Sequence, residues 1–205
     1  MLIRRVCLEQ VYMRIGVDVD EVLGDNLRVM LPWMKEHYGV SVAWRDMWSY
    51  KFYESWDETP SEAREQIDAF IESHAFATMP PVKGSQEAVH RLANNGHELF
   101  VVTSRPRFLD GVTEDWLHTH FGDVFEDTLY TDMHGFGEET PKHVLAQRHG
   151  LDVHLDDNAE YACHVSEVGV PVVLFNKPWN ALDDTRWNTY RADSWGSALH
   201  VLQRL

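Results

Sequence analysis

The chain has 205 residues, a formal net charge of −15 and an apolar fraction of 44%. That apolar fraction is ordinary for a folded protein, and the length suits one core domain with a substantial insertion, or two small domains. The acidity argues against a nucleic-acid polymer or an anionic membrane as a partner, because both would be repelled. An anionic substrate would need a metal ion and local cations at its site.

Residues 1–13 form a leader before the first strong strand. They lack the apolar core of a signal peptide, so we expect them to be dispensable, with Met13 as a candidate native start. No apolar run in the chain approaches the roughly 20 residues that span a bilayer. The two cysteines, Cys7 and Cys163, make no disulfide framework. A reduced, cytoplasmic protein is therefore expected.

The first predicted strand, Arg14–Asp18 (RIGVD), is a short apolar run that stops on a carboxylate. The character of the sequence then changes. Residues 26–38 and 61–74 have the apolar spacing of helices, an aromatic-rich stretch lies between them, and two prolines close the segment. We expect a small helical cap over 26–81, inserted after the first strand.

From residue 82 onward, helices and strands alternate. Helices are predicted over 84–95, 109–121, 141–149 and 159–167, and strands over 98–103, 127–131, 153–156 and 170–175. Short apolar strands that alternate with helices indicate a parallel sheet with right-handed crossovers. The expected fold is α/β, a Rossmann-like parallel sheet flanked by helices, with residues 14–25 and 82–205 in this core domain.

Chemically active side chains follow several of these strands. The first strand ends in Asp-Val-Asp, the second in Thr-Ser-Arg and a later one in Asp-Asp-Asn, while a lysine opens the helix before that later strand. Ligands of parallel α/β sheets bind at the carboxyl ends of the strands, so these side chains should converge. The predicted site residues are Asp18, Asp20, Thr103, Ser104, Arg105, Lys142, Asp156 and Asp157.

This set of residues fits phosphoryl transfer. Paired carboxylates can hold Mg²⁺, which prefers oxygen ligands and would cancel repulsion between a carboxylate and a phosphate oxygen. One aspartate can attack phosphorus, and a second, two residues on, can protonate the leaving oxygen and later activate water. Thr103 and Lys142 would bind the phosphoryl oxygens. The residues therefore predict a magnesium-dependent phosphatase.

The same segments resemble the motifs of the haloacid dehalogenase-like superfamily. DVDEVL at 18–23 resembles its first motif, VVTS at 101–104 the second, Lys142 the third, and LDDN at 155–158 the acidic fourth, all in the expected order. The resemblance implies Asp18 as nucleophile and Asp20 as general acid/base. It implies a phosphate site of Thr103, Ser104, Lys142 and Arg105.

For magnesium, the resemblance implies the Asp18 carboxylate, the Asp20 main-chain carbonyl and Asp157 as ligands. Asp156 would orient the site, although these roles of Asp156 and Asp157 could be exchanged. One departure is Glu21, which stands where many members have glycine and puts the tightness of the turn after Asp20 in question.

Finer features resemble the 5′(3′)-deoxyribonucleotidase, or pyrimidine 5′-nucleotidase, branch. They are TSRP at 103–106, the spacing from Lys142 to Asp157, LFNKPWN at 174–180 and YRADSW at 190–195. This resemblance implies hydrolysis of nucleoside (deoxyribonucleoside) monophosphates through an aspartyl-phosphate intermediate. It also implies a helical cap that closes over the nucleobase, with aromatic rings as candidate contacts. The candidates are Trp33, Trp44, Trp48 and Phe52.

Other interpretations remain open at this point. The substrate could be a sugar phosphate or another small phosphomonoester, and the fold could serve as a non-catalytic phosphate-binding module. Ser104 could cap a helix, Arg105 could be a surface ion-pair member, and aromatic rings in a cap are more often core than ligand contacts. An oligomer is equally compatible with the sequence.

Overall fold

The computed structural model describes residues 12–132, 139–183 and 188–205. All but the last two residues of the expected leader, including Cys7, lie outside these ranges. Within them, one sheet has the strand order β3-β2-β1-β4-β5-β6, and every neighbouring pair is parallel. Its strands are β1 (Arg14–Val17), β2 (Glu98–Thr103), β3 (Asp127–Tyr130), β4 (Val153–Asp156), β5 (Val172–Phe175) and β6 (Thr189–Ala192). The predicted parallel α/β fold is confirmed.

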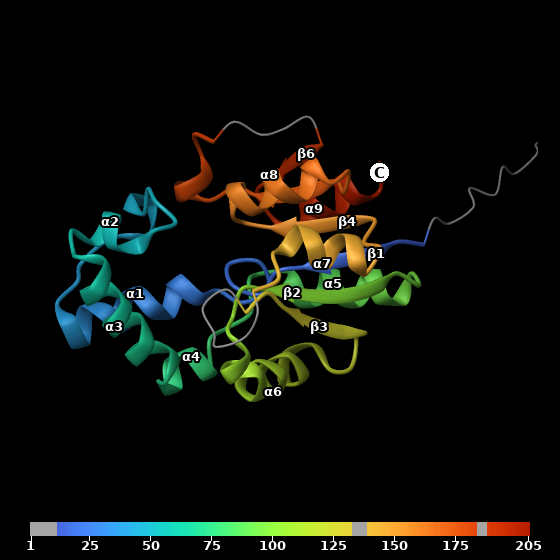
Figure 1. Ribbon diagram of the computed structural model, residues 1–205. Coiled ribbons are helices and arrows are strands. Elements are labelled where there is room, and N and C mark those ends of the chain that lie inside the picture. Colours follow the sequence, from blue (N-terminus) through green and yellow to red (C-terminus); the bar gives the residue numbers. More distant parts are fainter. Residues whose placement is uncertain (1–11, 133–138, 184–187) are drawn as a thin grey trace, which may run out of the picture.

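The helices form two groups, one that flanks the sheet and one that lies to one side of it (Figure 1). We call residues 26–81 the cap and residues 14–25 with 82–205 the core. The cap holds α1 (Asn26–Tyr38), α2 (Phe52–Trp56), α3 (Pro60–Ile71), α4 (His74–Ala77) and the 3₁₀ turn η1 (Trp44–Asp46). The core holds α5 (Ser85–Asn94), α6 (Asp110–Phe121), α7 (Lys142–Arg148), α8 (Ala159–Glu167), α9 (Trp195–Leu202), η2 (Arg107–Leu109) and η3 (Pro178–Asn180). That the cap and the core are separate domains remains a prediction.

The two faces of the sheet are covered by different helices. Helix α5 contacts α6 and α9, and these three bury one apolar cluster that includes Phe121 and Trp195. Helices α7 and α8 contact each other and bury a second cluster that includes Leu145 and Val165. Each fully buried large apolar side chain contributes about 1.5–3 kcal/mol. Because both faces are covered, the central strands are mostly buried and mainly apolar, which is the pattern that made them predictable.

Glycine is required in the middle of β1. A Cβ atom at Gly16 would lie 2.6 Å from Leu151 Cδ1 and 2.9 Å from the ring nitrogen Nδ1 of His154. The missing side chain therefore lets β4, which carries His154, approach β1 closely. This contact places the end of β4 beside the end of β1, where the predicted site lies.

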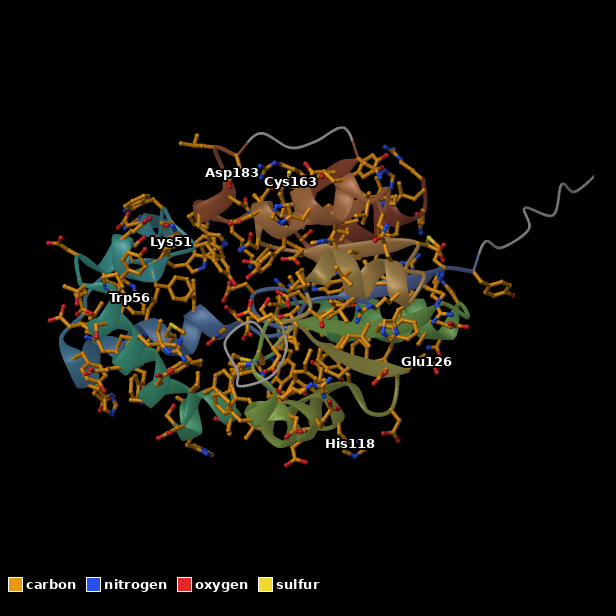
Figure 2. The ribbon with its side chains drawn as sticks, viewed as in Figure 1. Lys51, Trp56, His118, Glu126, Cys163 and Asp183 are labelled. Atoms are coloured by element: carbon orange, nitrogen blue, oxygen red, sulfur yellow. The ribbon has the colours of Figure 1, made fainter. Side chains whose placement is uncertain are left out.

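The cap has an apolar cluster of its own, built mainly from Met34, Met47, Phe70 and Phe76. In Figure 2, Trp56 lies inside the cap, and Lys51 lies near the boundary between the cap and the core. Leu109 and Trp179 of the core join the same cluster. The cap is therefore packed against the part of the core that follows the strands.

Several boundaries differ from the sequence-based expectation. The helix expected over 61–74 is two helices, because Ser73 caps a new one by accepting a hydrogen bond from the Phe76 amide at 3.3 Å. The strand expected from residue 170 starts at Val172, since Pro171 has no amide for the ladder. Strand β6 and helix α9 were not predicted. Within the described ranges, no helix is long and apolar enough to cross a membrane.

Candidate active site

The carboxyl ends of β2, β1 and β4 lie side by side, because these strands are neighbours in the sheet. Asp18 directly follows β1, and its amide donates a hydrogen bond of 3.0 Å to the Leu155 carbonyl of β4. Thr103 ends β2 and Asp156 ends β4. The structure thus brings together side chains that are far apart in the sequence, as the rule for parallel sheets predicts.

Lys142 is the positive centre of the site. Its ammonium Nζ lies 3.0 Å from Asp18 Oδ1 and 2.8 Å from Asp156 Oδ2, and the residue is 2% exposed. Burial acts to lower the pKa of Lys142, but the carboxylates of Asp156 and Asp18 outweigh it and raise that pKa. The lysine therefore stays charged at neutral pH.

Both carboxylate oxygens of Asp156 are engaged by protein donors. Oδ2 contacts Lys142 and, at 2.8 Å, Nε2 of His154, while Oδ1 accepts the Asn158 amide at 2.9 Å. Burial acts to raise the pKa of Asp156, but the Lys142 ammonium and the His154 hydrogen bond outweigh it and hold that pKa below its ordinary value. Asp156 is thus an ionised anchor for Lys142.

For Asp157 and Asp18 the pKa is shifted in the opposite direction, upward. Burial, Asp156 and Asp18 raise the pKa of Asp157 well above its ordinary value. Burial likewise raises the pKa of Asp18 to about 7, against the lowering effect of Lys142. The indole Nε1 of Trp179 donates to Asp157 Oδ2 at 2.9 Å. The positive charge near Asp18 and Asp157 is therefore too small to offset the cost of burying both carboxylates.

These carboxylates form a group that could hold a metal ion. Among the described residues, Asp18, Asp156 and Asp157 each offer an oxygen atom, and these atoms lie within 4.8 Å of one another. Because the oxygens of Asp156 already have donors, Asp18 and Asp157 are the pair that suits a cation. All three groups are buried oxygen ligands, which Mg²⁺ prefers over nitrogen or sulfur.

Asp20 and Arg105 form a bidentate pair at the entrance. Nε of Arg105 donates to Asp20 Oδ2 at 2.9 Å and Nη2 donates to Oδ1 at 2.8 Å. Asn26, the first residue of α1, adds a hydrogen bond of 3.0 Å to Oδ1. The sequence predicted Arg105 as a phosphate ligand. In the structure its guanidinium is paired with the Asp20 carboxylate.

The hydroxyl residues after β2 lie at the same end of the sheet. Thr103 is fully buried, and its Oγ1 accepts the Arg105 amide at 3.2 Å, so its hydroxyl proton can point elsewhere. Ser104 lines the cavity described below. Thr103 is not among the described lining residues, and the assignment of both residues to phosphate remains a prediction.

Glu21 is a residue that the sequence raised only as a departure from glycine. It adopts the left-handed conformation, with φ at 62°, at a cost of about 1–2 kcal/mol. The turn stays tight, because the Glu21 amide donates to the Gly24 carbonyl at 2.7 Å. Its buried carboxylate accepts the Leu27 amide of α1 at 2.7 Å and pairs with Lys177 Nζ at 3.1 Å. These contacts tie the loop of Asp20 to the cap.

A cavity of about 450 Å³ separates the cap from the strand ends. From the core, it is lined by Asp18, Asp20, Ser104, Arg105, Asp157, Tyr161 and Trp179, among others. From the cap, its lining includes Met30, Tyr50, Lys51, Phe52, Tyr53, Ile67 and Phe76. The cavity therefore has a charged floor and a mainly apolar roof.

The predicted cap aromatics divide between the cavity and other places. Phe52 lines the cavity. Trp33 instead stacks on His37, Trp44 packs edge-on against Trp179, and Trp48 is 63% exposed; none of these three is among the described lining residues. The rings that sequence reasoning missed are Tyr50, Tyr53, Phe76, Phe108, Tyr161 and Trp179. The first two belong to the aromatic-rich stretch already noted, so a signal for them was present.

Comparisons with known proteins agree with this geometry. A family model described as "5′ nucleotidase, deoxy (Pyrimidine), cytosolic type C protein" matches residues 12–205. The chain is 23% identical over 197 residues to "Putative nucleotidase YqfW" of Bacillus subtilis, covering 91% of this chain and 92% of the relative. It is 22% identical over 196 residues to a "Putative nucleotidase" of Bacillus cereus, covering 94% of this chain and 99% of the relative.

Solved structures share the fold. A predicted phosphatase from Clostridium acetobutylicum superposes with a TM-score of 0.70 at 14% identity, covering 95% of this chain and 100% of that one. A haloacid dehalogenase-like hydrolase, SP0104 from Streptococcus pneumoniae, gives 0.65 at 15% identity, covering 94% and 99%. Because a family model spans almost the whole chain, the protein belongs to the family described as 5′ nucleotidase, deoxy (pyrimidine), cytosolic type C, as a phosphatase of the nucleotidase type, and it shares its fold with haloacid dehalogenase-like hydrolases.

Proposed function

We propose that this hydrolase is a magnesium-dependent phosphomonoesterase that acts on nucleoside monophosphates, deoxyribonucleotides included, through an aspartyl-phosphate on Asp18. The observation that carries the proposal is the pair of buried carboxylates, Asp18 and Asp157, on the floor of a cavity with an aromatic roof, with Lys142 paired to Asp18. The floor suits a phosphate and a cation, and the roof suits a flat apolar group.

The charge at the floor supports a divalent cation as cofactor. Asp18 and Asp157 are buried, and the pKa of each is raised by burial and by neighbouring carboxylates, so a cation there would relieve an unfavourable arrangement. The Asp18 and Asp157 carboxylates and the Asp20 carbonyl would hold Mg²⁺, with Asp156 orienting Lys142. When bound, the ion would supply the positive charge that lets an anionic carboxylate approach an anionic phosphate.

Asp18 and Asp20 would divide the chemistry between them. The Asp18 carboxylate forms a bond to phosphorus as the bond to the leaving oxygen breaks, and Asp20 gives that oxygen a proton. Asp20 then takes a proton from the water that attacks the aspartyl-phosphate, which releases phosphate and restores Asp18. Lys142, Thr103 and Ser104 would stabilise the charge on the phosphoryl oxygens. Each donor would lower the barrier by at most about 3–4 kcal/mol.

The roof of the cavity favours a nucleoside over a sugar. The cavity volume of about 450 Å³ falls within the range of ordinary ligand sites. In its roof, Tyr50, Phe52 and Tyr53 offer ring surface. Stacking of a base on one ring contributes about 1–3 kcal/mol. A sugar phosphate would leave this apolar lining without a partner, and a non-catalytic module would not need the Asp18–Lys142–Asp156 arrangement.

Two assays test this proposal. Hydrolysis of p-nitrophenyl phosphate should require Mg²⁺, stop with EDTA and disappear in Asp18→Asn. A panel of nucleoside 5′- and 3′-monophosphates and sugar phosphates should then show the highest kcat/KM for a nucleotide. Full activity of Asp18→Asn would refute the nucleophile, and a clear preference for sugar phosphates would refute the substrate class.

A cytoplasmic location is part of the proposal, supported by the low cysteine content.

A further inference from the structure

The guanidinium of Arg105 is committed at each of its nitrogens. Nε and Nη2 hold the two oxygens of Asp20 at 2.9 and 2.8 Å, and Nη1 donates to Thr113 Oγ1 of α6 at 3.3 Å. Planar guanidinium and carboxylate groups match in this geometry, which fixes orientation as well as distance. The residue is only 5% exposed. It is therefore a built part of the site and not a mobile surface cation.

A ring of the cap holds the guanidinium from one face. The Phe76 ring of α4 lies 4.5 Å from Arg105 Cζ, in the arrangement of a cation–π contact. Phe76 itself is buried in the apolar cluster of the cap, and its ring packs edge-on against Phe70 of α3. Continuous contacts therefore run from the interior of the cap through Phe76 and Arg105 to the Asp20 carboxylate.

We propose that Arg105 is a positioning residue, which orients the Asp20 carboxylate under the control of the cap, and that it is not a ligand of the substrate phosphate. The inference rests on the proposed function, in which Asp20 is the general acid and base. Four of its five N–H donors already have partners, since Asp20 accepts two, Thr113 one, and Met79 Sδ lies 3.5 Å from Nη2. To hold a phosphate by two donors, the guanidinium would therefore have to release one of these partners. Asn26 of α1 donates to the same Asp20 Oδ1 that Nη2 of Arg105 contacts.

The leaving group gives a direct way to test this role. A general acid matters in proportion to the basicity of the oxygen that departs. p-Nitrophenolate leaves readily without a proton, whereas phenolate needs one much more. If Asp20 loses its orientation, hydrolysis of phenyl phosphate should therefore slow far more than hydrolysis of p-nitrophenyl phosphate. These two substrates have nearly the same shape, so the comparison does not depend on which natural substrate the enzyme prefers.

The experiment compares wild type, Arg105→Met, Arg105→Lys and Asp20→Asn on both phosphates with saturating Mg²⁺. For Arg105→Met we expect kcat/KM to fall about 100-fold on phenyl phosphate and only a few-fold on p-nitrophenyl phosphate, the pattern of a misplaced acid. Arg105→Lys should restore little, because an ammonium cannot hold both oxygens. Adding Arg105→Met to Asp20→Asn should cause little further loss on phenyl phosphate.

Inhibition by inorganic phosphate separates positioning from phosphate binding. The inhibition constant should stay within about twofold of wild type in Arg105→Met, because no phosphate contact is lost. A tenfold weaker inhibition, or equal losses of kcat/KM on the two aryl phosphates, would overturn the proposal. The matched control is Arg28→Met, which removes an exposed arginine of α1 whose nearest ionic partner is Asp25 at 3.8 Å; its kinetics should match wild type.

A second variant tests the link to the cap. Phe76→Leu keeps an apolar side chain but removes the ring face beneath Arg105, and we expect the same selectivity for p-nitrophenyl phosphate, with a smaller loss. If Phe76→Leu and Arg105→Met both keep the wild-type ratio between the two phosphates, the proposal is wrong. Failure of the proposed function would look different, since Asp18→Asn would then remain active or wild type would not need Mg²⁺.

Discussion

The floor and the roof of the cavity are built by different forces. At and beneath the floor, Lys142 forms ion pairs of 3.0 Å with Asp18 and 2.8 Å with Asp156, and His154 adds a hydrogen bond of 2.8 Å to Asp156. These contacts fix each side chain by direction as well as distance. At the roof, Phe52 and Phe76 belong to an apolar cluster that burial alone holds together. Directional contacts tolerate no change of residue type, whereas apolar packing tolerates many. The floor should therefore govern the chemistry and the roof the choice of substrate.

The largest effect should come from the nucleophile at the floor. In Asp18→Asn, kcat on p-nitrophenyl phosphate should fall by more than about 10⁴-fold, since an amide cannot attack phosphorus. The control Asp123→Asn changes an aspartate that is 93% exposed in its side chain, and it should keep wild-type kcat. Comparable activity in the two variants would dissociate the floor from the chemistry.

Removal of Lys142 should damage both catalysis and folding. Lys142→Met leaves Asp18 and Asp156 buried without their shared cation, so we expect about 10²–10³-fold lower kcat. The free energy of unfolding should fall by about 3–5 kcal/mol, the usual cost of an uncompensated buried charge. Denaturant unfolding measures the second effect. A variant as stable as wild type would mean that the carboxylates do not depend on Lys142.

Magnesium affinity should rise with pH. Burial raises the pKa of Asp18 to about 7 and that of Asp157 well above its ordinary value, so both bind protons where free carboxyls do not. Mg²⁺ must displace those protons, and its affinity should grow from pH 6 to 7 by up to about tenfold per pH unit for each proton displaced. Without metal, the same shift makes stability fall as the pH rises through 4 to 7. Calorimetry in buffers of different ionisation enthalpy should detect proton release.

The roof should affect substrate choice more than chemistry. Phe52→Ala should lower kcat/KM for the preferred nucleotide by about tenfold, within the range of one lost stacking contact, and should leave p-nitrophenyl phosphate within about twofold. Trp48→Ala, an aromatic of the same cap that is 63% exposed and outside the cavity lining, serves as the control and should match wild type. Equal losses on both substrates would place Phe52 in the chemistry.

The difference between floor and roof also explains what the sequence could predict. The strands before Asp18 and Asp156 are buried on both faces, so they are apolar runs with a clear end. Parallel strands then bring those ends together by geometry alone. The convergence of Asp18, Lys142 and Asp157 followed from local pattern and a general rule, without knowledge of any long-range contact.

The partners of Arg105 could not be predicted in that way. Its guanidinium direction depends on Phe76 of α4 and Thr113 of α6, which the sequence does not relate to each other. The prediction of which cap aromatics face the cavity was mostly wrong for a similar reason. Around Tyr50 and Phe52 the chain forms a turn and a helix of only five residues, so helical spacing does not report which ring faces inward.

The C-terminal elements were missed although a local signal existed. Ser194 and Ser197 cap helix α9 reciprocally, but the second position carries serine where glutamate or glutamine is the familiar sign. Strand β6 is at the edge of the sheet and mixes buried with exposed residues, so its pattern is weak. Trp195, the first residue of α9, nevertheless contacts the loop after β1, where its indole Nε1 donates to the Val22 carbonyl at 2.9 Å.

The most direct test of the account is to trap the phosphorylated enzyme. Wild-type protein is mixed with Mg²⁺ and p-nitrophenyl phosphate, quenched rapidly in acid, digested and mapped by mass spectrometry. We predict one phosphoryl group on the peptide that begins near Arg14, attached to Asp18, and none in Asp18→Asn. Rapid turnover with no phosphorylated peptide, or a phosphoryl group on a different residue, would contradict the account.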